Sequence, residues 1–457
     1  MRVHFPLILV FVFAITKSSI SQTSKTLAER PDPVWMTHYV AQGFIPSDLK
    51  VDLYGNVITA GTFEGHMTWK GGSRIPKRRP FPERSPNNYF ILKHDTEGRV
   101  LWKNFADGDA RISAILLDDS GCVYVTGEVF SRELIFTSSD SITYFLEKPM
   151  DEGSRGIFIC KYDRNGRILK LKFYSEGKSE TPGDMVLTKN GDLIIGGVIF
   201  YREGNELKRN FLLLRFDKDL NLLWKRVGDE MGRSQITAVC LDRFENIYVT
   251  GGFISHMRIC GKEVDHEDQD QRIFLARFNA NGDLKWFRTE AFKQDVLNFS
   301  QVGIDLACDQ RGRIYVTGSA ASRPFLARLN RRGKLKWHLQ CKGLTSYVSE
   351  LALNENGDVF LSGYGHGSEF PSTDKDTSHY TSKGSTDFYL SEYDKRGRQK
   401  FLWAGGGEGT DYASSIEVVD QRMYVLGRNL GGLPVVFDQF SINERFPVIW
   451  WGVFNLP

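Results

Sequence analysis

The sequence predicts an all-β fold, a seven-bladed β-propeller of four-stranded antiparallel blades. Three observations lead to this prediction. A strand-turn-strand unit recurs seven times, a second such unit follows the first six copies, and the chain of 457 residues contains 44 glycines and 13% aromatic residues. Many short strands joined by tight turns need both residue types. Two strand pairs in each repeat of about sixty residues are typical of propeller blades.

The first unit is clearest in LDRFENIYVTGG, at residues 241–252. An apolar run ends at Asp242, polar residues form a turn, and a β-branched and aromatic strand runs from Ile247 to Gly251. The other copies are VDLYGNVITAG (51–61), LDDSGCVYVTG (117–127), LTKNGDLIIGG (187–197), CDQRGRIYVTG (308–318), LNENGDVFLSG (353–363) and, with a shorter turn, VVDQRMYVLG (418–427).

The second unit also predicts a strand, a turn rich in Asp, Asn and Gly, and a strand. Its copies end at Trp102, Lys170, Trp224, Trp286, Trp337 and Phe401. Because tryptophan recurs at one place after the turn, we expect a structural ring that fills the wedge between neighbouring blades.

The two ends of the chain together predict closure of the ring. The seventh copy lacks a second turn and continues only through FPVIWWGVF, at 446–454. At the other end, PVWMTHYV (33–40) is similar to the strand that follows each second turn, with Trp35 in the place of the repeated tryptophan. We therefore expect the N-terminal strand to complete the last blade, which would pair strand edges that are otherwise exposed.

The first residues predict export. Arg2 precedes an apolar run from Phe5 to Ile15 that is too short to span a bilayer, and Ser19 and Ser21 favour cleavage before Gln22. The domains expected are a signal peptide (1–21), a short lead (22–32) and one propeller domain (33–457). A buried N-terminal strand is the alternative. We predict a secreted, periplasmic or outer-surface monomer without a transmembrane segment.

Charge and cysteine content narrow the class of protein further. A net charge of +3 with 25% charged residues argues against a nucleic-acid binder that relies on a basic field. The six cysteines lack the spacing of a zinc site. Buried free thiols are expected, with a disulfide between Cys240 and Cys308 as the alternative.

Residues 354–371, NENGDVFLSGYGHGSEFP, resemble the bacterial SBBP-type β-propeller repeat, whose pattern runs approximately D-x-x-G-N-x-Y-V-T-G, a polar stretch and Phe-Pro. Asp411-Tyr412-Ala413 matches the acidic-aromatic-Ala lead of the repeat. The resemblance extends from about Trp35 to Phe454 and implies a scaffold without one shared activity. It also implies that the strands ending near Asp118 and Asp242 are innermost.

Three turns depart from the SBBP pattern because they lack the expected glycine. They contain Glu245, Asp219-Leu220 and the shortened Gln421-Arg422. We expect these departures to affect the geometry of the individual turns and nothing else.

The implied strand order places the turns on one face and the variable connections on the other. These connections span 64–87, 131–155, 200–209, 255–271, 365–385 and 428–445. Variable loops on a rigid scaffold often carry binding residues. Polar residues at the starts of the inner strands are predicted to ring the channel mouth as a ligand site: Asp109, Glu180, Ser234, Gln301, Ser346 and Asp411. Ordinary water-facing strand ends are the alternative.

The variable connections supply further candidates for partner binding. The loop at 71–86 is basic, the loop at 261–271 is acidic, and Trp69 is an aromatic residue outside the repeat. The candidates are Trp69, Arg74, Arg78, Arg79, His256 and Asp268. Exposed charged loops without a partner are the alternative.

Metal motifs in the sequence are incomplete. Asp217, Asp219 and Asn221 have the spacing of a calcium loop but lack its glycine and distal glutamate. His66 and His256 follow equivalent glycines in blades one and four, which face each other across the ring, so solvated loop histidines are expected. We predict no metal or other cofactor, with a divalent cation at the channel mouth as the alternative.

No linear enzyme motif appears in the chain. The sequence therefore predicts a non-catalytic scaffold that binds a protein, glycan or cell-surface partner through its variable-loop face. The alternative is a lyase or hydrolase with a polar or cation site at the channel mouth, assembled from several blades.

Overall fold

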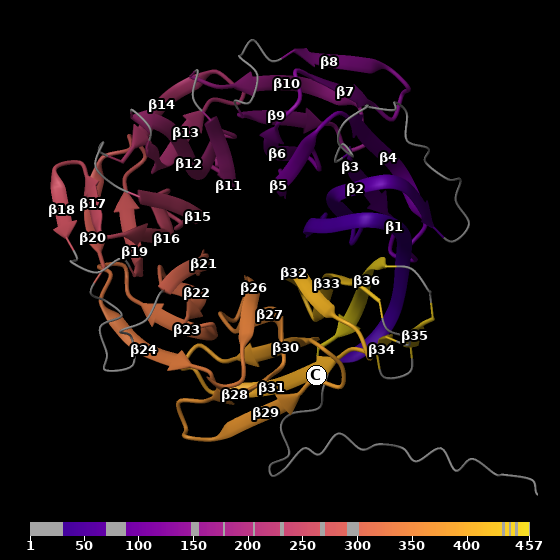
Figure 1. Cartoon of the computed structure of the whole chain (residues 1–457), viewed down its shortest axis with the longest axis vertical. Coiled ribbons are helices and arrows are strands. Elements are labelled where there is room, and N and C mark those ends of the chain that lie inside the picture. The colour runs from indigo at the N-terminus through magenta and orange to yellow at the C-terminus, as the bar shows by residue number, and fades with distance from the viewer. Residues whose placement is uncertain are drawn as a thin grey trace, which may run out of the picture.

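The computed structural model describes residues 31–69, 88–147, 155–176, 179–203, 206–228, 233–265, 270–289, 301–431, 435–437, 440–443 and 447–456. All regular secondary structure in these ranges is β-strand. Neighbouring strands pair antiparallel, apart from one parallel pairing at Arg209 and Arg233, within sheets that are arranged in a propeller-like ring (Figure 1).

Three sheets contain four strands each. The first has β5 (Ala110–Leu117), β6 (Val123–Val129), β9 (Gly156–Tyr162) and β10 (Ile168–Tyr174). The second has β21 (Gln301–Cys308), β22 (Ile314–Ala320), β23 (Arg323–Leu329) and β24 (Leu335–Gln340). The third has β26 (Ser346–Leu353), β27 (Val359–Gly365), β30 (Asp387–Tyr393) and β31 (Gln399–Gly405).

Two larger sheets combine groups of the same kind. One joins β11 (Ser179–Leu187), β12 (Leu193–Glu203), β13 (Glu206–Phe216) and β14 (Leu222–Val227) to β15 (Arg233–Leu241), β16 (Ile247–Ile254), β19 (Gln271–Phe278) and β20 (Leu284–Arg288). The other contains β2 (Val57–Trp69), β3 (Asn88–His94), β4 (Val100–Asp107), β32 (Asp411–Val419), β33 (Arg422–Asn429) and β36 (Val448–Asn455), all joined through β1 (Asp32–Val51).

Strand β1 connects the two ends of the chain. Its first half pairs with β36 from Asp32 to Val40, and its second half pairs with β2 as far as Val51. The strand β1 is thus the outer strand of the group β32, β33, β36 and β1, and the inner strand of the group β1, β2, β3 and β4. Below, each such four-stranded group is called a sheet and is named by its first strand. The inner strands β1, β5, β11, β15, β21, β26 and β32 surround the centre of the ring (Figure 1).

The turns between first and second strands share one hydrogen-bond pattern. In four of them the leading Asp accepts the backbone N–H groups of the residues two and four positions later at 2.9–3.0 Å: Asp52, Asp118, Asp242 and Asp309. The fourth turn residue has a positive φ, as Gly121 does at 80°. Glu245 and Leu220 adopt the same left-handed conformation without glycine, at 61° and 63°. These two departures therefore leave the left-handed turn conformation unchanged.

The repeated tryptophans connect neighbouring sheets, as the sequence predicts. Their indole N–H groups donate to backbone carbonyls in the second turn of the next sheet at 3.0–3.4 Å: Trp102 to Arg164, Trp224 to Ala280, Trp286 to Arg331 and Trp337 to Lys395. In β1, the Trp35 ring lies against Gly98, where an added Cβ would come within 2.8 Å of it. Each indole thus covers the turn of its neighbour.

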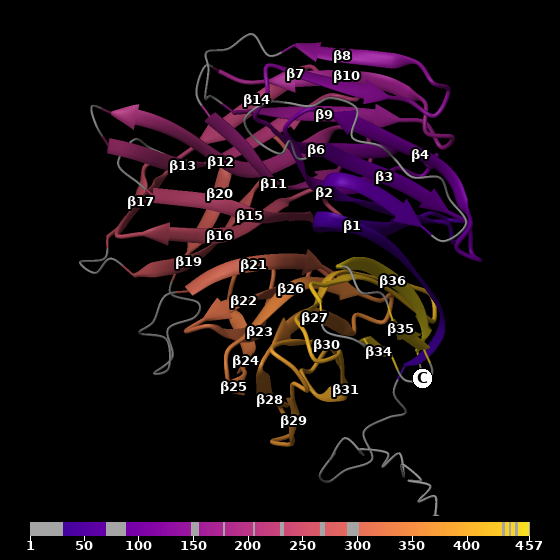
Figure 2. The same ribbon diagram turned by 45° about the vertical axis from the view of Figure 1, so that its right-hand side comes forward.

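Several variable connections form hairpins where the sequence predicts loops. They are β7 (Glu133–Thr137) with β8 (Thr143–Glu147), β17 (His256–Ile259) with β18 (Lys262–Asp265), β28 (Gly367–Pro371) with β29 (Thr377–Thr381), and β34 (Val435–Phe437) with β35 (Phe440–Ile442). Strand β7 pairs with β4 of the preceding sheet, and β28 pairs with β25 (Lys342–Gly343), which follows β24. Figures 1 and 2 both show β7 and β8 at the outer edge of the molecule.

The hydrophobic core lies between sheets. One cluster combines Ile58 and Ile91 of the sheet that starts at β1 with Ile115, Val125 and Phe158 of the sheet that starts at β5. All five side chains are almost fully buried. Similar clusters join the other neighbouring sheets, so adjacent sheets hold one another in register around the centre.

Candidate functional site

The six polar residues predicted at the channel mouth lie at or next to the starts of inner strands. Five are buried, with exposed fractions of 0–6%: Glu180, Ser234, Gln301, Ser346 and Asp411. Asp109 is partly exposed. The burial of these five residues argues against the alternative of ordinary water-facing strand ends.

Four of these side chains bond to groups near their own strands. Glu180 accepts hydrogen bonds from the Ser175 hydroxyl at 2.7 Å and the Glu176 N–H at 3.1 Å. Ser234 accepts the N–H of Phe211, and Ser346 accepts the Ser368 hydroxyl. Asp411 accepts the Gly407 N–H and the Asn429 side-chain amide, both at 2.9 Å. These contacts hold connections in place and do not join the predicted residues into one pocket, so a shared ligand site among them stays a prediction.

The residue after each buried position is more exposed. The set consists of Thr181, Gln235, Val302, Tyr347 and Tyr412, all partly or fully exposed. Successive side chains of a strand alternate in direction, so a shift of one residue changes the side that they face. Sequence reasoning selected the polar residue at each strand start and missed the residue that follows it.

Two of these more exposed residues belong to a tyrosine-arginine cluster, which we call the tyrosine rim. The rings of Tyr347 and Tyr364 lie 5.5 Å apart, and those of Tyr364 and Tyr412 lie 4.3 Å apart in a T-shaped contact. The Arg428 guanidinium lies 4.5 Å from the Tyr412 ring centre. Because these residues come from β26, β27, β32 and β33, two neighbouring sheets build the rim on the face of the variable connections.

A second aromatic-cation group lies beside β6. The guanidinium groups of Arg111 and Arg155 lie 5.4 and 4.9 Å from the Phe130 ring centre. Arg155 also contacts Glu128 at 3.5 Å, and Glu128 accepts the Thr181 hydroxyl at 2.9 Å. The group therefore bridges the sheets that start at β5 and β11, and the charge of Arg155 is paired with Glu128.

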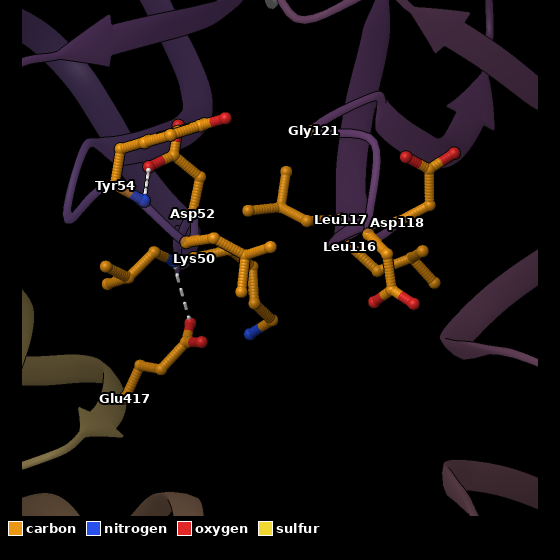
Figure 3. A pocket seen from close by; sticks show the side chains of 11 residues that line it. Lys50, Asp52, Tyr54, Leu116, Leu117, Asp118, Gly121 and Glu417 are labelled. Atoms are coloured by element: carbon orange, nitrogen blue, oxygen red, sulfur yellow. Dashed lines mark hydrogen bonds between the residues drawn. The ribbon is translucent and has the colours of Figure 1, made fainter.

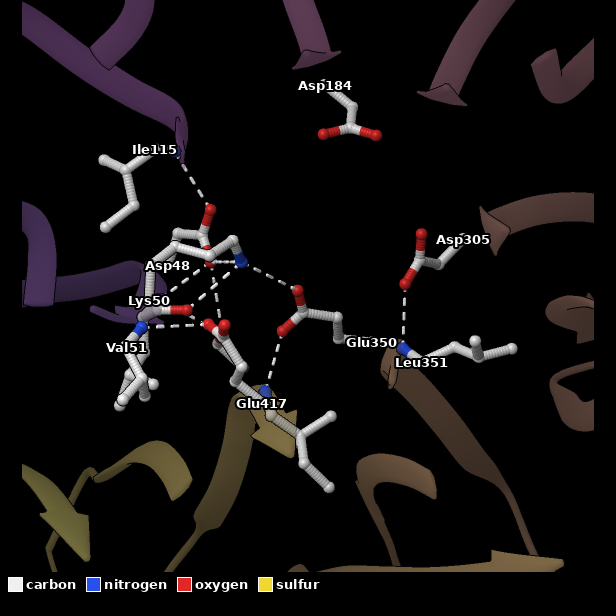
Figure 4. A network of polar contacts seen from close by, with 12 residues as sticks. Asp48, Lys50, Val51, Ile115, Asp184, Asp305, Glu350, Leu351 and Glu417 are labelled. Atoms are coloured by element: carbon white, nitrogen blue, oxygen red, sulfur yellow. Dashed lines mark hydrogen bonds and ion pairs between the residues drawn. The ribbon is translucent and has the colours of Figure 1, made fainter. Parts of the chain in front are cut away.

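Carboxylates project into the centre of the ring from the inner strands (Figure 4). Each accepts a backbone N–H from the next sheet at 2.7–3.2 Å: Asp48 from Ile115, Asp184 from Val239, Asp305 from Leu351, Glu350 from Ile416 and Glu417 from Val51. We call these five residues with Lys50 the channel network. The edge of an inner strand that faces the channel has backbone N–H groups outside the strand pairing, and these carboxylates accept hydrogen bonds from some of them.

Local irregularity positions most of the network. Asp48, Asp184, Asp305 and Glu350 each follow a register shift in the pairing of the inner strand. A β-bulge of this kind redirects a side chain and leaves backbone groups outside the ladder. The bulges therefore explain why these carboxylates reach across to the neighbouring sheet.

Charge in the channel network is unbalanced. The network has five carboxylates and one ammonium, that of Lys50, which lies 2.7 Å from Asp48 and 3.5 Å from Glu350. Burial raises the pKa of Asp184 to about 7 and that of Glu417 to about 8. All five carboxylates lie deep in the ring, but most keep some exposure to the channel, so water moderates this effect.

A pocket of about 270 Å³ opens on the opposite face, where the first turns lie. Figure 3 shows Asp52 and Tyr54 on one side of it, Leu117 and Asp118 on the other, and Glu417 at its base toward the channel. The Lys93 ammonium pairs with Asp52 at 2.8 Å, and although burial opposes the change, this contact lowers the pKa of Asp52. Sequence reasoning assigned no function to this face.

Most of the predicted partner-binding loop residues lie outside the described side chains. They are Trp69, whose backbone ends β2, and Arg74, Arg78, Arg79 and Asp268. His256 is described: its Nδ1 contacts Asp265 and lies 3.5 Å from Glu263. The three groups could hold a metal ion. Both carboxylates are more than half exposed, and a surface ion pair across the β17–β18 hairpin accounts for the arrangement equally well.

All six cysteines are free thiols. Cys240 on β15 and Cys308 on β21 are neighbours, and burial together with the Cys308 thiol raises the pKa of Cys240. The alternative disulfide between them is not formed in this structure.

Comparisons with known proteins give no family. No family model matches the chain, and no curated protein matches it. Among solved structures, virginiamycin B lyase from Staphylococcus aureus is similar with 10% identity and a TM-score of 0.47, over 92% of this chain and 99% of that one. A gluconolactonase from Xanthomonas campestris has 12% identity and a TM-score of 0.34, over 79% and 100% of the two chains. At these TM-scores the likenesses carry no inference about activity.

One further solved structure is similar to this chain, again with a low TM-score. A protein of unknown function from Bacteroides caccae has 12% identity and a TM-score of 0.38, over 69% of this chain and 89% of that one. Within the described ranges, no helix has the length and apolar character needed to cross a membrane.

Proposed function

We propose that this chain is an exported seven-bladed β-propeller of the SBBP repeat type, with four strands in each blade, and that it binds a partner without catalysis. The inner strands of the blades are β1, β5, β11, β15, β21, β26 and β32. The strand order within the sheets and the repeated inner turns support this assignment. The shared strand β1 would close the ring.

The observation that carries the binding proposal is the tyrosine rim. Tyr347 is 38% exposed on the face of the variable connections and contacts Tyr364. Tyr364 in turn contacts Tyr412 of the next sheet, and the Arg428 guanidinium lies against the Tyr412 ring. Aromatic faces stack on the C–H surface of sugars, and a guanidinium donates hydrogen bonds to hydroxyl groups. A glycan is therefore the ligand that we test first, with a protein or cell-surface partner as the other outcome.

Burial argues against catalysis by the acids that the sequence favours. Glu180 and Asp411 are fully buried, and both oxygen atoms of each carboxylate accept hydrogen bonds. A general acid or base must reach the proton that it transfers. These two carboxylates instead fix the connections around them.

The channel network supports a second candidate, a lyase or hydrolase with its acidic groups in the channel. The observation that favours it is that Asp184, unlike Glu180 and Asp411, keeps some exposure to the channel, while burial raises its pKa to about 7. Groups with a pKa near the working pH are the most effective general acids and bases. Turnover that is lost in Asp184→Asn and kept in Tyr412→Ala would favour this candidate over the binding proposal.

Substitution of the rim is expected to abolish glycan binding. The double variant Tyr347→Ala/Tyr412→Ala removes both stacking surfaces, and we expect at least a tenfold loss of affinity for any polysaccharide that the wild-type protein retains on a glycan array. The matched control is Tyr54→Ala, which removes a tyrosine that is 76% exposed on the opposite face. Equal losses in both variants would contradict the assigned site.

A further inference from the structure

A pair of buried aspartates lies between the sheet that starts at β26 and the sheet that starts at β32. Asp387 begins β30 and Asp411 begins β32, and their exposed fractions are 2% and 0%. Asp411 uses both oxygen atoms as hydrogen-bond acceptors. The Oδ2 atom of Asp387 accepts the Lys383 N–H at 3.0 Å, whereas its Oδ1 atom is buried without a partner.

The unpartnered oxygen of Asp387 lies next to Gly406, which has no side chain to fill the space there. A Cβ atom added to Gly406 would lie 2.5 Å from Asp387 Oδ1 and 2.9 Å from Asp411 Oδ2. Both carboxylates therefore approach the same point of the backbone, and any larger residue at this position would displace them. The absence of a side chain keeps the space between the two oxygen atoms open.

A second glycine holds the surrounding loops together. A Cβ atom on Gly384 would lie 2.3–2.5 Å from backbone atoms of Gly407 and Glu408. The Ser385 N–H donates to the Gly409 carbonyl at 3.0 Å, and the Asp411 N–H donates to the Thr386 carbonyl at 2.8 Å. These contacts hold the backbone on either side of the two aspartates in place.

The charge of the pair is not neutralised by the described side chains. Neither carboxylate forms an ion pair within the described ranges, although Lys383 acts on Asp387 at longer range. Burial raises the pKa of Asp387, and it raises the pKa of Asp411 to about 6, with Asp387 as a further cause. A buried carboxylate of this kind needs a proton or a cation.

We propose that Asp387 and Asp411 bind a divalent cation with a preference for oxygen ligands, such as Ca²⁺, and that Asp387 Oδ1 supplies the open ligand. Hard cations take carboxylate, backbone carbonyl and water oxygens. The cation would tie the sheet that contains β30 to the sheet that starts at β32. It would also fix the position of Tyr412, which directly follows Asp411. The proposal does not depend on the partner-binding function.

The test compares the protein after chelation with the same protein given Ca²⁺, Mg²⁺ or Mn²⁺. We expect one cation bound per chain in calorimetry, and a higher Tm when that cation is added. Asp387→Asn keeps the size of the side chain and should lose at least tenfold in affinity and the rise in Tm. Gly406→Ala places a methyl group next to both carboxylates and should lose cation binding, although neither aspartate is replaced.

The control is Asp119→Asn, which changes an exposed aspartate in a turn of another sheet and should bind the cation as the wild type does. The competing interpretation is a carboxyl pair that shares a proton. In that case no cation would change the Tm of the wild-type protein, and the proposal would be wrong. Binding that survives Asp387→Asn and Gly406→Ala would also overturn it.

Discussion

Replacement of Lys50 by Met is expected to destabilise the protein by about 3–5 kcal/mol at pH 8, because it leaves the carboxylates of the channel network without their cation. The Lys50 ammonium contacts Asp48 and Glu350, and it also acts on Glu417. Burial of Lys50 opposes its charge, yet these carboxylates raise its pKa well above the ordinary value. The lysine is therefore charged throughout the range in which the protein is handled.

The cost of Lys50→Met should depend on pH. Burial raises the pKa of Glu350, and it raises the pKa of Glu417 to about 8. At Glu350 and Glu417 the folded state of the wild type thus binds more protons than the unfolded state, for Glu417 between about pH 4.3 and pH 8, and the contribution of these two groups to stability falls as the pH rises. Without Lys50 the free energy of unfolding should fall more steeply with pH. The variant should therefore be destabilised less, relative to the wild type, at pH 5 than at pH 8.

Chemical denaturation at pH 5 and pH 8 measures this effect. The control is Lys170→Met, which breaks an exposed ion pair with Asp219 and should cost less than about 1 kcal/mol at either pH. Glu350→Gln can still accept the Ile416 N–H with its amide oxygen, so it should partly rescue Lys50→Met. Equal destabilisation by Lys50→Met at both pH values would show that repulsion among the carboxylates is not its cause.

Removal of the first half of β1 is expected to cost most of the stability of the ring. A chain that begins at Ala41 loses the strand that pairs with β36 and loses the buried Tyr39 ring. Trp451 then loses its contact with Trp35, whose ring centre lies 4.4 Å away. The aromatic area exposed is worth several kcal/mol, out of a total that is commonly about 5–15 kcal/mol.

Thermal unfolding and size-exclusion chromatography test this prediction. The control is a chain that begins at Pro31 and keeps all of β1. We expect the shorter chain to unfold at a much lower temperature or to associate through the exposed edge of β36. A synthetic peptide of residues 31–43 should restore part of the lost stability. An unchanged Tm in the shorter chain would mean that the pairing of β1 with β36 does not hold the ring together.

The strand order could be predicted because its signals are local and repeated. Asp242 and its counterparts form the same turn in several sheets, and one position after the second turn carries Trp102, Trp224, Trp286 and Trp337. The hairpins inside the variable connections could not be predicted, because β7 pairs with β4 of the preceding sheet and β28 pairs with the short strand β25. Such pairings leave no short-range pattern in the sequence.

The tyrosine rim contains none of the residues that the sequence predicts for the channel mouth, but Tyr347 and Tyr412 directly follow two of them. The sequence predicts a ligand contact for the polar residue at a strand start, such as Ser346. That residue is buried, whereas the next residue, Tyr347, is exposed. Alternation along a strand gives the spacing of side chains but not which side faces water at its end. The contact of Tyr364 with Tyr412 joins two sheets, so only the three-dimensional structure reveals the tyrosine rim.

Hydrogen exchange with and without a glycan that the protein retains tests the central proposal most directly. We predict slower exchange in peptides that cover residues 346–365 and 411–429, which carry the tyrosine rim, and no change in the turns at 52–56 and 118–122 on the opposite face. Protection confined to those turns, where the pocket of Figure 3 lies, would contradict the proposal and place the ligand on the other side of the ring.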